Sequence, residues 1–253
     1  MNRPLKPGKV WLVGVGPGDP DLATVRAARV LGQVQVWLVD DLVSSDMRRY
    51  ARPGTQIISV GKRGGRCSVS QASIHALTLA HALAGRDVAR VKGGDPLLFG
   101  RGGEEAEFLR AHGIAVEVVN GISSGMAAAQ ALGIALTHRA HCHGVTFVTA
   151  HTSGDGGPDW RALAAGGTTL VIYMGMGRLC AIRDALLAAG MRPDMPAGVV
   201  MHASGPGERR WSGTLATLAE ALAAGLASPA VVLIGGVVER AVATQAVARM
   251  NAA

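Results

Sequence analysis

Glycines, basic residues and adjacent carboxylates are concentrated in one segment, residues 90–105, which is the part of the chain best suited to chemistry. Its sequence is Arg-Val-Lys-Gly-Gly-Asp-Pro-Leu-Leu-Phe-Gly-Arg-Gly-Gly-Glu-Glu. Glycine lacks a Cβ, so a ligand can approach the backbone and φ can be positive. A flexible surface connection is the alternative, but flexible linkers favour Ser and Gly without an ordered Asp-Pro turn. The segment therefore predicts a ligand-binding loop.

A second glycine-rich segment, residues 13–20, has the sequence Val-Gly-Val-Gly-Pro-Gly-Asp-Pro. It partly matches the dinucleotide-binding pattern Gly-x-Gly-x-x-Gly. The third glycine falls at Gly18, however, and Asp19 stands where the pattern requires glycine. A carboxylate at that place would repel a pyrophosphate. The segment is therefore not expected to bind a dinucleotide, and a plain turn between a strand and a helix remains an alternative.

Charged residues that are candidates for a functional site follow two short apolar runs. Asp40 and Asp41 follow residues 36–39, and Lys62 and Arg63 follow residues 56–60. A helix N-cap or a solvated charge is the ordinary alternative for an acid at the end of a strand, and we favour that alternative for Asp41.

Histidines and a cysteine are crowded into residues 138–143, so a metal site is conceivable. His138, His141, Cys142 and His143 fit no standard zinc-ligand spacing. We expect these to be solvated loop side chains and expect no metal.

Short β-branched runs alternate with Ala/Leu-rich stretches along the chain, which predicts layers of α-helix and β-sheet. The apolar run 87–92 and the helical stretch 106–111 place the first glycine-rich segment after a strand, where open α/β sheets bind ligands. The organisation predicted is an N-terminal α/β lobe over 1–120, a connecting segment over 121–143 and a C-terminal α/β lobe over 144–253. The expected strands are 10–15, 34–39, 56–60, 87–92, 115–119, 145–149, 168–173, 197–202 and 230–234.

The composition excludes some classes of protein. No apolar run in the 253 residues approaches the roughly 18 that a membrane-spanning helix needs. The formal net charge of +7 suits an anionic partner or a solvated basic face, but nucleic acid is disfavoured because aromatic residues are only 4% of the chain. Three cysteines without close pairing indicate neither a disulfide framework nor a thiolate metal site, so we expect a cytoplasmic protein.

Residues 92–105 also resemble the Lys-Gly-Gly-Asp-Pro-x-x-Phe-Gly-Arg-Gly-Gly-Glu-Glu signature of uroporphyrinogen-III C-methyltransferases. Other segments resemble motifs of the same family and occur in the same order. Among them are Leu-Thr-His-Arg at 136–139, Tyr-Met-Gly at 173–175 and Ser-Pro-Ala at 228–230, whereas Gly-Val-Gly-Pro-Gly-Asp at 14–19 resembles a motif of the wider superfamily. The resemblance extends from about residue 10 to residue 238.

The resemblance implies a fold, a reaction and a set of roles. The fold would be the two-lobed tetrapyrrole methylase fold, with a mixed sheet flanked by helices in each lobe and the cofactor in the cleft between the lobes. The protein would be a homodimer that transfers two methyl groups from S-adenosylmethionine to uroporphyrinogen III, giving precorrin-2 and S-adenosylhomocysteine. Asp40 would be the general base and Lys62 a proton donor. Cofactor contacts would come from Pro17, Gly93, Gly94, Asp95, Leu98, Ser123, Ser124, Met174 and Ala203. Charge and loop position suggest Arg63, Arg101 and Arg139 for substrate carboxylates.

Four residues depart from the family pattern. Val39 replaces a Tyr, Asp41 replaces an Arg that could meet a substrate carboxylate, Asn120 replaces a Pro and Glu208 replaces a Gln. They leave two alternatives open: a methyltransferase of the same fold that acts on a later corrin precursor, and a non-catalytic tetrapyrrole-binding paralogue.

Overall fold

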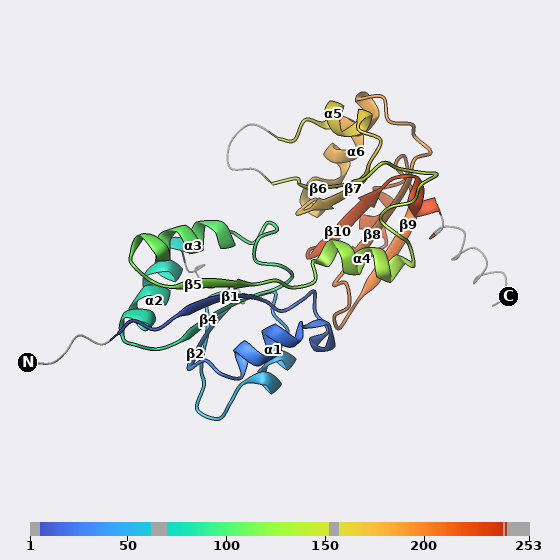
Figure 1. The fold of residues 1–253 in the computed structure, drawn as a ribbon. Coiled ribbons are helices and arrows are strands. Elements are labelled where there is room, and N and C mark those ends of the chain that lie inside the picture. The colour runs from blue at the N-terminus through green and yellow to red at the C-terminus, as the bar shows by residue number, and fades with distance from the viewer. Residues whose placement is uncertain (1–5, 62–69, 152–156, 240, 242–253) are drawn as a thin grey trace, which may run out of the picture. The chain divides into compact units, whose positions relative to one another are not determined.

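The computed structural model describes residues 6–61, 70–151, 157–239 and 241. The chain divides into two compact units, Met1–Ser123 and Ser124–Ala253, and each unit contains its own five-stranded sheet (Figure 1). The α/β class and the presence of a sheet in each half, as the sequence predicts, are confirmed.

All the strand pairings in the first sheet are parallel. Its strands, in the order β3-β2-β4-β1-β5, are β1 (Val10–Gly14), β2 (Val36–Val39), β3 (Gln56–Ser59), β4 (Val88–Lys92) and β5 (Val116–Val119). The expectation of a mixed sheet in each lobe is thus met only by the second sheet, because helical crossovers between the first five strands return the chain to the same edge each time. The carboxyl ends of all five strands therefore lie along one edge.

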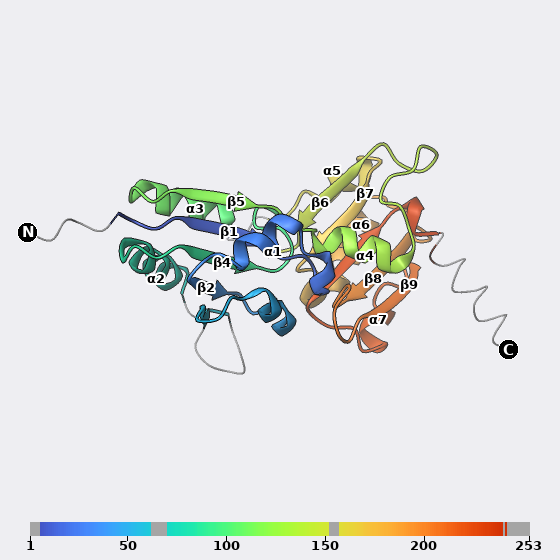
Figure 2. The ribbon, with the colours of Figure 1, turned by 60° about the horizontal axis from the view of Figure 1, so that its bottom comes forward.

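Helices cover both faces of the first sheet. The helix α1 (Val25–Leu31) and the 3-10 helix η2 (Ser45–Tyr50) pack on one face, and α2 (Gln71–Leu83) and α3 (Gly102–Ala111) pack on the other (Figures 1 and 2). A further 3-10 helix, η1 (Pro20–Leu22), precedes α1. Successive residues of one strand enter opposite cores, as for Leu12 beside α2 and α3 and Val13 beside α1 and η2.

Two histidines of α2 are expected to make the stability of the protein depend on pH. Burial lowers the pKa of His75 and of His81 below the ordinary 6.5, and the buried His81 Nδ1 has no hydrogen-bond partner among the described residues. As the pH falls below about 6.5, the unfolded chain takes up protons before the folded chain does, so the free energy of unfolding decreases. Urea denaturation should show lower stability at about pH 5.5 than at about pH 7.5. A His75→Gln/His81→Gln variant should show a smaller difference between the two pH values, and an undiminished difference would contradict the assignment.

The second sheet is mixed, with the order β6-β7-β10-β8-β9. The strands β6 and β7 are parallel, and the other pairings are antiparallel. The strands are β6 (Val145–Thr149), β7 (Thr169–Tyr173), β8 (Pro196–Met201), β9 (Arg209–Thr214) and β10 (Ala230–Ile234). The helices are α4 (Ser124–Leu132), α5 (Trp160–Ala165), η3 (Met176–Arg178), α6 (Leu179–Ala188), α7 (Glu220–Ala223) and η4 (Gly236–Val238).

Part of the segment expected to connect the lobes lies in the second core. Ala127, Ala128 and Ala131 of α4 are buried against one face of the second sheet, whereas α5 and α6 cover the opposite face (Figure 2). The Gly125 N–H at the start of α4 donates a hydrogen bond to Tyr173 Oη at 2.8 Å. This helix is therefore a structural layer of the second unit.

Candidate active site

Three glycine-rich loops meet at the carboxyl edge of the first sheet. They lie at the ends of the neighbouring strands β1, β4 and β5 and comprise residues 14–18, 93–98 and 120–121, respectively. Together they are called the loop assembly. Gly16 and Gly94 exchange backbone hydrogen bonds, with N···O distances of 2.7 and 3.3 Å. The Gly121 N–H and the Asn120 side-chain amide each donate to Asp95 Oδ2 at 3.1 Å. Loops that are far apart in the sequence are thus fastened into one backbone surface.

Glycine is required where these loops cross. A Cβ on Gly121 would lie 2.1 Å from the Gly94 carbonyl oxygen, and a Cβ on Gly14 would lie 2.6 Å from the same atom. Real Cβ atoms do not approach backbone atoms so closely, so any larger residue would push the loops apart. The sequence pattern predicted close backbone approach, and the structure shows which backbones approach each other.

The variant Gly121→Ala is expected to disrupt the loop assembly. Overpacking of this kind costs about 1–3 kcal/mol, and urea denaturation would measure the loss. Gly103→Ala is the matched control, because a Cβ there meets no atom within 4 Å and the residue lies in the first turn of α3. Equal stability of the two variants would contradict the role assigned to Gly121.

Asp40 lies at the same edge and is held by two cations of the adjacent strand. It follows β2, and its half-buried carboxylate accepts hydrogen bonds from Arg90 Nη2 at 2.5 Å and from Lys92 Nζ at 3.1 Å. Arg90 and Lys92 are alternate residues of β4, so both side chains lie on the face of the sheet that α2 and α3 cover. Asp40 therefore has a fixed orientation and a charge balanced on two sides.

Glu105 of α3 completes a buried ion-pair network with Asp40, Arg90 and Lys92. Its Oε1 lies 3.2 Å from both Arg90 Nε and Lys92 Nζ, and it also accepts a hydrogen bond from Gln71 Nε2 at 3.0 Å. The side chains of Arg90, Lys92 and Glu105 are only 2, 5 and 3% exposed. Two cations and two carboxylates balance, which is the condition under which charges are tolerated in a protein interior.

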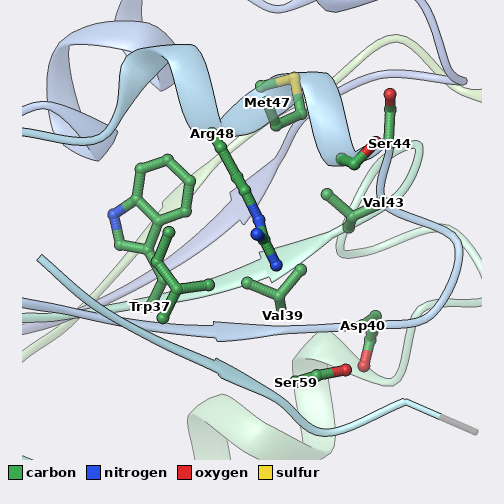
Figure 3. Close-up of a pocket in the computed structure, with 10 residues that line it drawn as sticks. Trp37, Val39, Asp40, Val43, Ser44, Met47, Arg48 and Ser59 are labelled. Atoms are coloured by element: carbon green, nitrogen blue, oxygen red, sulfur yellow. The ribbon is translucent and has the colours of Figure 1, made fainter. Parts of the chain in front are cut away.

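Asp40 also lines a small pocket on the other face of the sheet (Figure 3). This Asp40 pocket has a volume of about 130 Å³. Its walls come from β2, β3 and η2, and the lining residues are Trp37, Val39, Asp40, Val43, Ser44, Ser45, Met47, Arg48, Ile57 and Ser59.

The remaining predicted residues of the first unit lie in or beside the loop assembly. Pro17, Gly93, Gly94, Asp95 and Leu98 belong to it, and the Leu97 N–H is a further donor to Asp95 at 2.8 Å. Ser123 is buried at the end of the unit.

Arg101 has a charged partner of its own. It precedes α3 with a positive φ of 58° and forms a two-point ion pair with Glu104, which raises the pKa of Arg101 and lowers that of Glu104. Lys62 and Arg63 lie outside the described residues.

In the second unit, the predicted cofactor residues lie at strand ends with unusual backbone conformations. Met174 follows β7 with φ 54° and a half-exposed side chain. The buried Ala203 follows β8 and is flanked by His202 and Ser204, with φ values of 50° and 57°. Such conformations are strained for residues other than glycine and are concentrated at functional loops. Ser124 begins α4, and Arg139 is exposed in the turn before β6.

Two of the departures from the family pattern have local partners. Asn120, in place of Pro, supplies the side-chain donor to Asp95. Glu208, in place of Gln, accepts hydrogen bonds from the Ser204 N–H at 2.6 Å and from Arg210 Nε at 2.8 Å. Both replacements therefore fasten the loops in which they occur.

Two kinds of feature are not found among the described residues. No group of three or more His, Cys, Asp or Glu side chains there is arranged to hold a metal ion. Within the same residues, no helix has the length and apolar character needed to cross a bilayer.

Comparisons with known proteins, by sequence and by structure, both find methyltransferases that act on tetrapyrroles. Residues 9–219 match the family model for tetrapyrrole (corrin/porphyrin) methylases. Uroporphyrinogen-III C-methyltransferase from Pseudomonas aeruginosa is 50% identical over 231 residues, which cover 91% of this chain and 94% of the relative. The crystal structure of uroporphyrin-III C-methyltransferase from Thermus thermophilus, complexed with S-adenosylhomocysteine, has 43% identity and a TM-score of 0.79, covering 92% of this chain and 99% of that one. Cobalt precorrin-4 methyltransferase, a cobalamin biosynthetic enzyme, has 28% identity and a TM-score of 0.80, covering 91% of this chain and 95% of that one.

Proposed function

This chain belongs to the tetrapyrrole (corrin/porphyrin) methylase family, and on that premise we propose that it is an S-adenosylmethionine-dependent uroporphyrinogen-III C-methyltransferase. The reaction transfers two methyl groups to pyrrole carbons of uroporphyrinogen III and gives precorrin-2 and S-adenosylhomocysteine. The observation that carries the proposal is 50% identity to an enzyme of that name over nearly the whole of both chains.

The loop assembly suits S-adenosylmethionine in its chemistry. At Gly93, Gly94 and Gly121 the backbone is bare of side chains, so the polar amino-acid and ribose groups of the cofactor can approach it closely. In this proposal Pro17, Leu98 and Ser123 complete the contacts from the first unit, and Ser124, Met174 and Ala203 follow from the family resemblance. Asp95 is likewise a proposed cofactor contact by resemblance, and its carboxylate also binds the loop backbone and so holds the assembly in shape.

When bound, S-adenosylmethionine supplies the methyl group from its sulfonium sulfur. The sulfur keeps the electron pair of the broken C–S bond and becomes the thioether sulfur of S-adenosylhomocysteine. The pyrrole carbon contributes the electron pair of the new C–C bond, so the methylated macrocycle is left with a proton to release or relocate. Asp40 is the proposed acceptor of that proton, since its carboxylate lies at the edge of the sheet where the loop assembly lies and is oriented by Arg90 and Lys92. Lys62 is the proposed proton donor by resemblance.

The substrate carries several carboxylates, and the chain is basic. Arg63, Arg101 and Arg139 are proposed carboxylate contacts on the basis of charge and loop position. The ion pair with Glu104 means that Arg101 would have to share its guanidinium with the substrate. By resemblance we also propose a homodimer, and we propose a cytoplasmic location from the cysteine pattern.

A comparison of substrates tests the proposal. The similar TM-scores of 0.79 and 0.80 show that the fold alone does not separate uroporphyrinogen III from a later corrin precursor as substrate, whereas the identities of 43 and 28% favour the former. With methyl-labelled S-adenosylmethionine under anaerobic conditions, label should enter uroporphyrinogen III in preference to precorrin-4. Preference for precorrin-4 would favour the later-precursor alternative, and binding without transfer to either would favour the non-catalytic paralogue.

A further inference from the structure

The Asp40 pocket contains a basic side chain that the sequence analysis did not identify. Arg48 extends from η2 into the pocket toward Val39 of β2 (Figure 3). Its guanidinium makes no hydrogen bond and no ion pair with any described residue. The neighbouring arginine differs, because Arg49 pairs with Asp21. Arg48 is exposed to solvent, and it brings to the lining of this pocket a positive charge that has no charged partner among the described residues.

The acid in the same pocket does not neutralise Arg48. Both carboxylate oxygens of Asp40 form ion pairs with cations on the other face of the sheet: Oδ1 pairs with Arg90 and Oδ2 pairs with Lys92. The other polar groups that line the pocket are the hydroxyls of Ser44, Ser45 and Ser59, which can donate hydrogen bonds to an anion. A guanidinium in a pocket that also has hydroxyls in its lining is suited to a carboxylate, since its N–H groups match the two carboxylate oxygens.

The size of the pocket limits what it could hold. A water molecule needs about 10–15 Å³ of such space, so a volume of about 130 Å³ has room for a carboxyl group on a short stem but not for a macrocycle. The apolar wall formed by Trp37, Val39 and Met47 would contact the methylene stem of such a group.

Two of the four departures from the family pattern, Val39 and Asp41, fall at or beside this pocket. Val39 lines it where the family has the larger Tyr, and the adjacent Asp41 stands where the family has an Arg. A cation is therefore lost at one position after β2, while Arg48 brings a cation to the space beside Asp40 from the helix that follows.

We propose that Arg48 binds one peripheral carboxylate of the tetrapyrrole substrate in the Asp40 pocket, which rests on the function proposed above, and so positions the macrocycle beside the general base. The contact forms with substrate and persists through methyl transfer, so it lowers KM and has little effect on kcat. Lysine would retain the charge but lose the planar fork.

The test is steady-state kinetics of methyl transfer to uroporphyrinogen III at saturating S-adenosylmethionine. Arg48→Ala is expected to raise KM roughly tenfold, the lower end of the range for a hydrogen bond to a charged group, with kcat within about twofold. Arg48→Lys should recover part of the loss. Added salt should raise the KM of the wild type more than that of Arg48→Ala, because salt screens the attraction that the variant lacks.

Arg110→Ala is the matched control. Arg110 is an exposed arginine in the last turn of α3, and α3 begins at the carboxyl edge of the sheet, so its last turn lies at the opposite edge. Its loss should leave KM unchanged. An Arg48→Ala enzyme with the KM and salt dependence of the wild type would overturn the inference while leaving the proposed function intact. A wild-type protein that transfers no methyl group would overturn the proposed function and this inference with it.

Discussion

Asp40→Asn is expected to reduce methyl transfer by about 10²–10⁴-fold, the range for loss of a general base. The amide matches the carboxylate in shape but cannot take up the proton that the methylated macrocycle releases. Single-turnover measurements at saturating S-adenosylmethionine would show the loss in the chemical step. Calorimetric titration with S-adenosylhomocysteine should show unchanged cofactor affinity, since Asp40 lies outside the loop assembly.

The adjacent acid provides a matched control for that variant. Asp41 is exposed and is not a member of the ion-pair network, so Asp41→Asn should turn over near the wild-type rate. Full turnover by Asp40→Asn with cofactor bound would show that another group takes the proton. Equal losses in both variants would show a general effect of charge at the end of β2.

Glu105→Ala is expected to cause the largest loss of stability. It removes the most deeply buried carboxylate of the network and leaves Arg90 and Lys92 with only the half-buried Asp40. Breaking a buried ion pair from one side costs about 3–5 kcal/mol, because the remaining charges stay buried without compensation. Urea denaturation would measure the decrease in the free energy of unfolding. Glu105→Gln keeps an acceptor for Arg90 and Lys92 and should lose less.

Glu104→Ala is the control for Glu105→Ala, because the two residues are adjacent in α3 but differ in environment. Glu104 is exposed, its one ion-pair partner among the described residues is Arg101 at the surface, and surface pairs contribute little. Its unfolding midpoint should lie near that of the wild type. If Glu105→Ala were as stable as Glu104→Ala, the buried network would not be the stabilising feature described.

Much of the fold could be predicted from local patterns. The β-branched runs predicted nine strands, and each corresponds to a strand of the structure. The strand that the sequence did not indicate, β9, lies at the edge of its sheet and begins with the exposed Arg209 and Arg210. An edge strand buries little, so its sequence lacks the apolar run on which strand prediction depends.

The site was only partly predictable, for a related reason. Glycine spacing indicated the ligand-binding loops, because the backbone requirement is local. The partners of Asp40 depend on β2 lying next to β4, and no local pattern specifies strand order. The cations at alternate positions of the buried strand β4, Arg90 and Lys92, are a signal that could have indicated a charged partner on α3. Arg48 required the structure, since its side chain enters the pocket from a short 3-10 helix that no periodicity predicted.

The most direct test of the account is the mass of the tetrapyrrole formed by the wild-type protein. The protein would be incubated anaerobically with enzymatically generated uroporphyrinogen III and methyl-labelled S-adenosylmethionine, and the product would be examined by mass spectrometry. The account predicts a gain of two labelled methyl groups, added one at a time, with release of S-adenosylhomocysteine. A tetrapyrrole of unchanged mass, from a protein that still binds the cofactor, would contradict it.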